Sequence, residues 1–110
     1  MKVTLRNQKL GKIINDKRKL VRKYGDKNAK LIVQRLDQLK AADCFMTVVK
    51  FNIGGCHSLE GDLKGKYGLK LDHPDRLIIQ PVIDKNMDVS KLNLCEIKEV
   101  IVWEVKDYHG

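Results

Sequence analysis

The sequence predicts a single α+β domain over residues 1–110, with an N-terminal helical hairpin packed on a small twisted antiparallel β-sheet. Apolar residues recur at helical spacing in about the first forty residues, and they alternate with period two after Gly65. A length of 110 residues suffices for one core but not comfortably for two. The hydrophobic fraction of 43% beside 33% charged residues is typical of a globular chain, which excludes a disordered or membrane protein.

The first third of the chain predicts a short strand and two helices. Lys2 to Leu5 alternate as a strand does. From Asn7 the apolar residues follow helical spacing until Gly25, which predicts the end of the first helix. A second helix is expected from about Ala29 to Ala42. Its candidate N-caps are Asp26 and Asn28.

The middle of the chain is ambiguous between a buried loop and a strand. Val48, Val49, Phe51 and Ile53 are apolar and partly β-branched, and Gly54 and Gly55 end whatever element precedes them. The glycines that follow in GDLKGKYG do not form a phosphate loop, because the GK[ST] ending and the strand–loop–helix setting are both missing.

The second half of the chain predicts three strands. Lys66–Leu71 and Asp75–Val82 form a hairpin whose turn is Asp72–Pro74. The polar stretch Ile83–Leu94 is expected to be a long loop. Ile97–Lys106 is the strongest strand pattern in the sequence.

The net charge of +8 is concentrated in the N-terminal third. Residues 1–35 carry twelve Lys or Arg and two Asp or Glu, whereas residues 36–110 carry ten and twelve. A one-sided basic face commonly meets nucleic acid, and the alternative is a solvated helix face that keeps the protein soluble. The candidate RNA-binding residues are Lys12, Lys17, Arg18, Lys19, Arg22, Lys23 and Lys66.

Cysteine usage and hydropathy indicate a reducing, cytoplasmic environment. Cys44, Cys56 and Cys95 are odd in number and far apart, so we expect buried free thiols rather than disulfides. Cys56 precedes His57, but no second pair completes a metal site, and no cofactor is expected. No apolar run approaches the roughly 20 residues that span a bilayer, and the first residues lack a secretory pattern.

Three motifs occur in order in the second half of the chain. They are HSLEGDLKGKY at His57–Tyr67, PDRLII at Pro74–Ile79 and VKDYHG at Val105–Gly110. Together they resemble the HigB-type branch of the RelE/ParE toxin superfamily, the plasmid maintenance killer proteins. The resemblance covers most of the chain and implies a RelE-like fold. The stretch from Asp84 to Leu94 looks longer than the turn that the family pattern leads us to expect.

The resemblance implies a ribosome-dependent mRNA interferase, silenced by a HigA-like helix-turn-helix antitoxin. RNA cleavage without a metal needs a base for the 2′-hydroxyl, an acid for the leaving oxygen and cations around the phosphorus. His57 and His109 are the candidate acid/base pair, in either order. The other candidates are Lys64, Lys66 and Arg76 as charge stabilisers, Tyr108 as a stacking or hydrogen-bonding group, and Asp107 as an orienting group.

The family has a lysine where this chain has Glu60, and this difference leaves alternatives open. Glu60 either serves as a base or disables cleavage, which would leave an antitoxin-binding or regulatory module. A gyrase-poisoning toxin related to ParE is a further alternative.

Taken singly, several residues in and near the motifs also have structural readings. His57 would then be a packed or surface imidazole, and Arg76 would form an ion pair with Asp75 or Asp72. His73 is expected to be structural, in a turn, and Trp103 to belong to the core.

Overall fold

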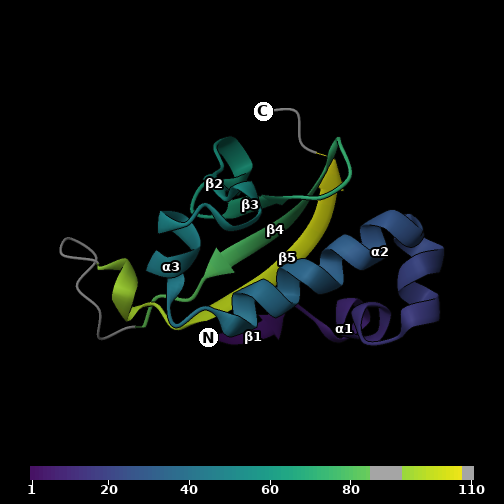
Figure 1. Cartoon of the computed structure of the whole chain (residues 1–110), viewed down its shortest axis with the longest axis horizontal. Helices are drawn as coiled ribbons and strands as arrows, with labels where there is room; N and C mark the ends of the chain where they lie inside the picture. The colour runs from purple at the N-terminus through teal and green to yellow at the C-terminus, as the bar shows by residue number, and fades with distance from the viewer. Residues whose placement is uncertain (85–92, 108–110) are drawn as a thin grey trace.

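Three helices pack against one face of a five-stranded sheet in the computed structural model, which describes residues 1–84 and 93–107 (Figure 1). The predicted α+β class is confirmed. The helices are α1 (Gln8–Ile14), α2 (Lys17–Ala41) and α3 (Phe45–Lys50). The strands are β1 (Lys2–Leu5), β2 (His57–Ser58), β3 (Tyr67–Lys70), β4 (Asp75–Pro81) and β5 (Glu99–Asp107). Short 3-10 turns are η1 (Ile53–Gly55), η2 (Gly61–Leu63) and η4 (Leu94–Glu96).

The sheet is mixed, so the expectation of a wholly antiparallel sheet is wrong. The strand order is β1-β5-β4-β3-β2, and β1 runs parallel to β5 while the other neighbours are antiparallel. Hairpin neighbours joined by short turns must be antiparallel. β1 and β5 lie at opposite ends of the chain, so no short turn fixes their relative direction.

The helical layer has one break more than predicted. The first helix ends at Ile14, and Asp16 caps the start of α2 by accepting from the backbone N–H of Arg18 at 3.0 Å and of Lys19 at 3.2 Å. The predicted break at Gly25 is confirmed, since its φ of 85° and ψ of 163° interrupt α2. The helical hairpin therefore has an additional short first helix.

The ambiguous middle segment forms α3, neither the loop nor the strand considered above. Phe45 and Val48, three residues apart, are fully buried in the main core, and this spacing suits a helix. The predicted loop from Ile83 to Leu94 falls largely on residues 85–92, which lie outside the described residues.

Asn28 joins the helical layer to the β3–β4 turn. Its side-chain NH₂ donates to Oδ2 of Asp75 at 2.8 Å, and its side-chain oxygen accepts from the backbone N–H of Asp72 at 2.8 Å. Asn28 is 6% exposed, and its side chain holds the two layers together. It is therefore not the N-cap of the second helix, for which Asp26 and Asn28 were the two candidates. An ion pair of 3.1 Å between Lys27 and Asp72 reinforces the same contact.

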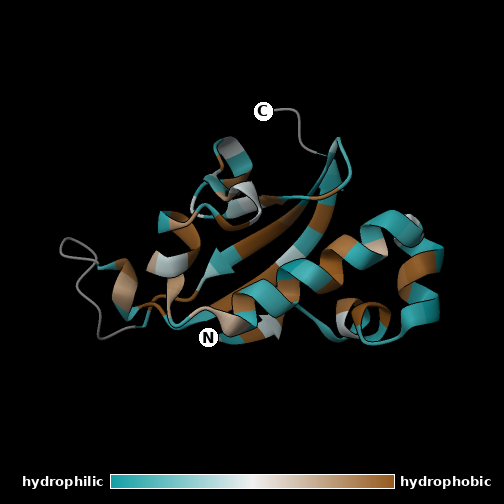
Figure 2. Cartoon of the chain, in the orientation of Figure 1, coloured by the Kyte–Doolittle hydropathy of each residue, from teal (hydrophilic) through white to brown (hydrophobic). Residues whose placement is uncertain are grey.

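Two hydrophobic clusters lie on opposite faces of the sheet. The larger cluster joins the helices to one face, and hydrophobic residues run along β4 and β5 in Figure 2. The smaller cluster contains Leu59, Leu63 and Ile78, with Trp103 packed against it. We call the face that carries the smaller cluster the outer face. Among the helices of residues 1–84 and 93–107, none is both long and apolar enough to cross a membrane.

Candidate functional site

The outer face carries His57, Arg76 and Lys66 among the predicted site residues that the structure describes. Leu69 and Leu77 are completely buried in the main cluster. Since side chains alternate along a strand, the residues flanking them point to the outer face. Those residues are Gly68 and Lys70 on β3, and Arg76 and Ile78 on β4.

Three cations form one row across this face, which we call the cation row. Lys70 on β3 is the direct partner of Arg76 on β4, and Arg76 is the direct partner of Lys106 on β5. Lys70 and Lys106 are exposed and Arg76 is half-buried. Arg76 donates from Nη1 to the carbonyl oxygen of Asp75 at 2.9 Å. Within the described residues it forms no ion pair with the carboxylate of Asp75 or Asp72, which was its structural alternative. Like charges placed directly opposite one another destabilise a sheet, so the row suits an anionic ligand.

His57 lies over the next row of the same face. Its partner on β3 is Gly68, and a Cβ built at Gly68 would stand 3.3 Å from Cε1 and 3.5 Å from Nε2 of the imidazole. Nδ1 of His57 lies 3.2 Å from the carbonyl oxygen of Gly55. A carbonyl oxygen only accepts, so Nδ1 carries the proton and Nε2 is the acceptor in the neutral ring. The exposed imidazole is thus oriented with its accepting Nε2 unpaired among the described residues.

Gly55 brings His57 and the cation row together. The side chain of Lys70 passes so close that a Cβ at Gly55 would stand 2.8 Å from its Cδ and Cε. Gly55 has a φ of 63°, a conformation that L side chains rarely adopt. The same short turn therefore accepts a hydrogen bond from the imidazole and leaves room for the side chain of Lys70.

The residues that follow β2 are less closely tied to this site. Glu60 and Lys64 flank η2 and are exposed. Among the described residues, no hydrogen bond or ion pair joins either side chain to His57 or Arg76. The geometry therefore leaves both roles considered for Glu60 open.

Trp103 stands between two cations on the outer face. Cζ of Arg6 lies 4.1 Å from the ring centroid, and Nζ of Lys66 lies 4.3 Å from it. The expectation that Trp103 is a core residue is only partly confirmed, because it packs on the small cluster but stays half-buried. Lys66, predicted to contact RNA, is thus held by an aromatic ring.

The predicted C-terminal motif is described only as far as Asp107. Asp107 ends β5 as the partner of Asp75, one row beyond the cation row. Tyr108 and His109 lie outside the described residues, so their roles stay predictions.

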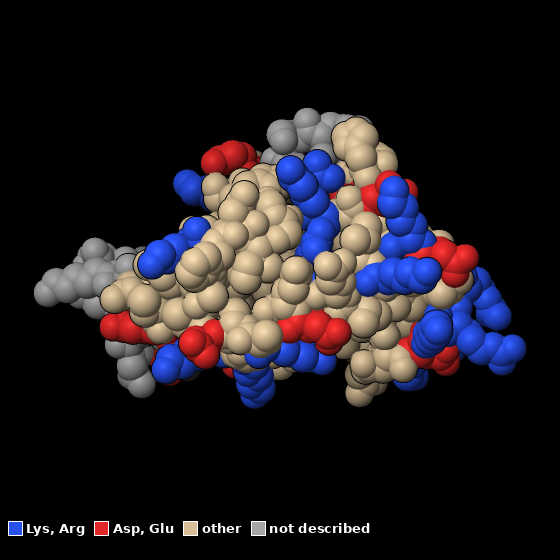
Figure 3. Space-filling view, in the orientation of Figure 1, with Lys and Arg blue, Asp and Glu red and all other residues tan. Residues whose placement is uncertain are grey.

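The predicted basic helix residues are all exposed. Figure 3 shows Lys and Arg gathered over the end of the molecule that carries α1 and the first half of α2. Six of the predicted RNA-binding residues belong to this surface, which we call the basic helix surface. They are Lys12, Lys17, Arg18, Lys19, Arg22 and Lys23.

The cysteines correct one expectation. Cys44 and Cys56 are only partly buried and Cys95 is exposed, so the prediction of buried thiols is wrong, although all three are free. Burial raises the pKa of the Cys56 thiol to about 11. Cys56 therefore stays protonated beside His57 near neutral pH and is a poor nucleophile. Within residues 1–84 and 93–107, no three His, Cys, Asp or Glu side chains gather as a metal site.

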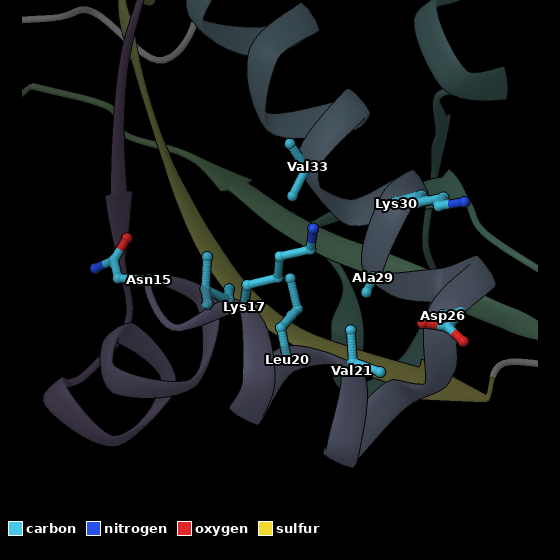
Figure 4. Close-up of a pocket in the computed structure, with 9 residues that line it drawn as sticks. Asn15, Lys17, Leu20, Val21, Asp26, Ala29, Lys30 and Val33 are labelled. Atoms are coloured by element: carbon cyan, nitrogen blue, oxygen red, sulfur yellow. The ribbon is translucent and has the colours of Figure 1, made fainter.

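An apolar groove of about 490 Å³ lies at the bend of α2, on the helical side of the molecule. Leu20, Val21 and Ala29 line it, with Lys17 and Lys30 among the residues around them (Figure 4). It belongs to the helical layer and is separate from the outer face.

Sequence reasoning missed Lys70 and Lys106. The signal was present in YGLKL and WEVKD, where each lysine alternates with apolar neighbours and so falls on the side away from the core. The strand register was also needed to place both lysines beside Arg76.

Comparison of the chain with protein-family models, curated proteins and solved structures found no match. The assignment of a function therefore rests on the motifs and the geometry.

Proposed function

We propose that the protein is a type II toxin, an mRNA interferase that cuts translated mRNA on the ribosome. The observation that carries the proposal is the position of His57, with an accepting Nε2, at one edge of the sheet face that carries the cation row. The order of the three motifs resembling HigB-type toxins supports the same assignment.

The arrangement on the outer face suits attack by a ribose 2′-hydroxyl on the adjacent phosphate. His57 takes the 2′ proton through Nε2 as the new bond from O2′ to phosphorus forms. The bond from phosphorus to O5′ breaks, and the leaving O5′ takes a proton from an acid. The acid in this proposal is His109, on the evidence of the motif alone. The products are a 2′,3′-cyclic phosphate and a 5′-hydroxyl end.

The cation row supplies the charge that this reaction needs. Negative charge builds up on the phosphate oxygens in the transition state, and fixed cations stabilise it. Arg76 is central because both its neighbours in the row are lysines. This row compensates for the cation that the family has at the position of Glu60.

The proposal assigns a separate role to the basic helix surface. Its exposed lysines and arginines suit the phosphates of RNA on the ribosome, with an affinity that falls as salt rises. A HigA-like antitoxin and a cytoplasmic site of action complete the proposal. The antitoxin rests on the resemblance, and the cytoplasmic site of action rests on the cysteine usage and hydropathy of the sequence.

The test is induction of the protein alone, followed by mapping of mRNA 5′ ends in the cells. We expect growth arrest and new cleavage sites within translated frames. His57→Gln should lower the cleavage rate on the order of 100-fold or more, as loss of a general base does. His73→Gln is the matched control, because His73 is an exposed histidine in the β3–β4 turn. Equal cleavage by the two variants would contradict the role of His57, and absence of cleavage by the wild type would contradict the function.

A further inference from the structure

A polar cleft lies at the edge of β5, beyond the end of β1. β1 pairs with β5 only as far as Leu5 and Val102, and the next residue, Arg6, donates its backbone N–H to the carbonyl oxygen of Val102 at 3.0 Å. Past this point no described strand pairs with β5 on the side of β1. The cleft has a volume of about 250 Å³ and is closed on its other side by α1 and α2.

A bulge brings two residues of β5 to this cleft. Ile78 pairs with Glu104 and Ile79 with Val102, so Trp103 is the extra residue. A bulge increases the local twist and changes the direction of side chains. Both Trp103 and Glu104 line the cleft.

The lining combines cations, aromatic rings and one carboxylate. Arg6, Lys9 and Lys23 supply positive charge, and Tyr24 and Trp103 supply the aromatic rings. Arg6 rests over the Trp103 ring at 4.1 Å. Bases of single-stranded RNA stack on aromatic rings and on arginine guanidinium planes. The cleft thus holds the groups that an unpaired base and its phosphate need.

Glu104 supplies the carboxylate of the cleft. Its carboxylate is half-buried, and it has no hydrogen bond or ion pair with any of the residues that the structure describes. It is close enough to Tyr24 that burial, followed by the negative charge of Glu104, raises the pKa of the tyrosine. A carboxylate accepts hydrogen bonds only, and the Watson–Crick edge of guanine offers two adjacent donors, N1–H and N2–H. Adenine, cytosine and uracil each place an acceptor next to the donor, which repels the carboxylate.

We infer that this cleft binds a guanine of the RNA strand, a few nucleotides from the bond that is cut. The inference rests on the proposed RNA substrate. The cleft is smaller than the roughly 300–1,000 Å³ of sites for whole small molecules, which favours one base of a longer strand over a free nucleotide. His57, Gly68, Ile78 and Glu104 are successive partners across four strands. Three strand spacings amount to roughly 14 Å, within reach of a short RNA.

The test measures binding of fluorescent single-stranded hexanucleotides that differ only in one guanine, replaced by inosine or adenine. Inosine lacks N2–H, so wild-type affinity should fall severalfold with inosine and about tenfold with adenine. Glu104→Gln should abolish this discrimination. The control Glu96→Gln removes the same charge from an exposed residue on η4 and should keep the discrimination. Free GMP is a further probe and should bind far more weakly than the hexanucleotide.

The outcomes separate the two proposals. Tight RNA binding with no preference between guanine, inosine and adenine would overturn the guanine cleft and leave the nuclease proposal standing. Absence of hexanucleotide binding to the wild type would overturn the guanine cleft, whereas the nuclease proposal would be contradicted by absence of cleavage of translated mRNA. GMP binding as tight as that of the hexanucleotide would overturn the inference of an RNA strand, because a free nucleotide would then be the ligand.

Discussion

Arg76 and Lys106 are direct partners across β4 and β5, and Lys70 is the partner of Arg76 on its other side. Cross-strand neighbours of like charge destabilise a sheet by about 0.2–1 kcal/mol. The cation row therefore lowers the free energy of unfolding of the free protein. We propose that this row binds an anion.

Removing one charge of the row should stabilise the free protein. We expect Lys106→Gln to raise the free energy of unfolding by about 0.2–1 kcal/mol in low salt. The gain should disappear at high salt, because salt screens the repulsion between exposed charges. Urea denaturation at two salt concentrations measures this effect. Lys98→Gln, at an exposed lysine outside the row, should show no such gain, and equal behaviour of the two variants would contradict the repulsion.

The same substitution should weaken RNA binding. If Lys106 contacts a phosphate, Lys106→Gln reduces the slope of log affinity against log salt by about 1, whatever the RNA sequence. Fluorescence anisotropy over a salt series gives the slope. An unchanged slope would show that Lys106 does not contact the phosphate backbone.

Gly68 should matter for activity more than for stability. A Cβ at this position would stand 3.3 Å from Cε1 of His57 and 3.4 Å from Cδ2 of Leu59, so Gly68→Ala displaces the imidazole. Alanine gains roughly 0.5–1 kcal/mol over glycine in a strand, which offsets the crowding. We expect cleavage to fall at least severalfold, with a nearly unchanged melting temperature. Gly11→Ala, in α1, is the control and should leave cleavage intact. Full activity of Gly68→Ala would exclude this packing of His57.

Asn28 should be a stability residue. Asn28→Ala removes the donor to Asp75 and leaves the backbone N–H of Asp72 without its partner. An unsatisfied buried group costs about 1–3 kcal/mol. Urea denaturation should show a loss in this range. The exposed Gln34→Ala on α2 should change stability little, and an equal effect of both would contradict this role of Asn28.

The cysteines should react in a defined order. Hydrogen bonds from the Thr47 backbone, the first of several causes, lower the pKa of Cys44, whereas burial raises that of Cys56 to about 11. The thiolate is the reactive form, so only about 0.1% of Cys56 is reactive at pH 8. Iodoacetamide should label Cys44 first, and raising the pH to 10 should accelerate Cys56 more than Cys44. Mass spectrometry of the labelled peptides measures the order. Labelling of Cys56 before Cys44 would contradict these environments.

The sequence predicts those elements whose periodicity is unambiguous. Period two placed β3, β4 and β5, and Gly25 marked the interruption of α2. α3 was not predicted, because Thr47, Val48 and Val49 are β-branched and favour strands in isolation. The segment is helical because a helix buries both Phe45 and Val48 in the main core.

The candidate site was predictable only in part, because it depends on register. His57 and Arg76 came from the motifs. Lys70 and Lys106 join them only once the partners across β3, β4 and β5 are known. The guanine cleft depends on the bulge at Trp103, which no pattern in the sequence indicated.

The most direct test of the account is cleavage of a defined mRNA on purified translating ribosomes, with analysis of the new ends. The account predicts cuts that leave a 2′,3′-cyclic phosphate and a 5′-hydroxyl. It also predicts that these cuts become on the order of 100-fold slower with His57→Gln and stay at full rate with His73→Gln. An mRNA left intact by the wild-type protein, or cut at the same rate by the His57 variant, would contradict the central claim.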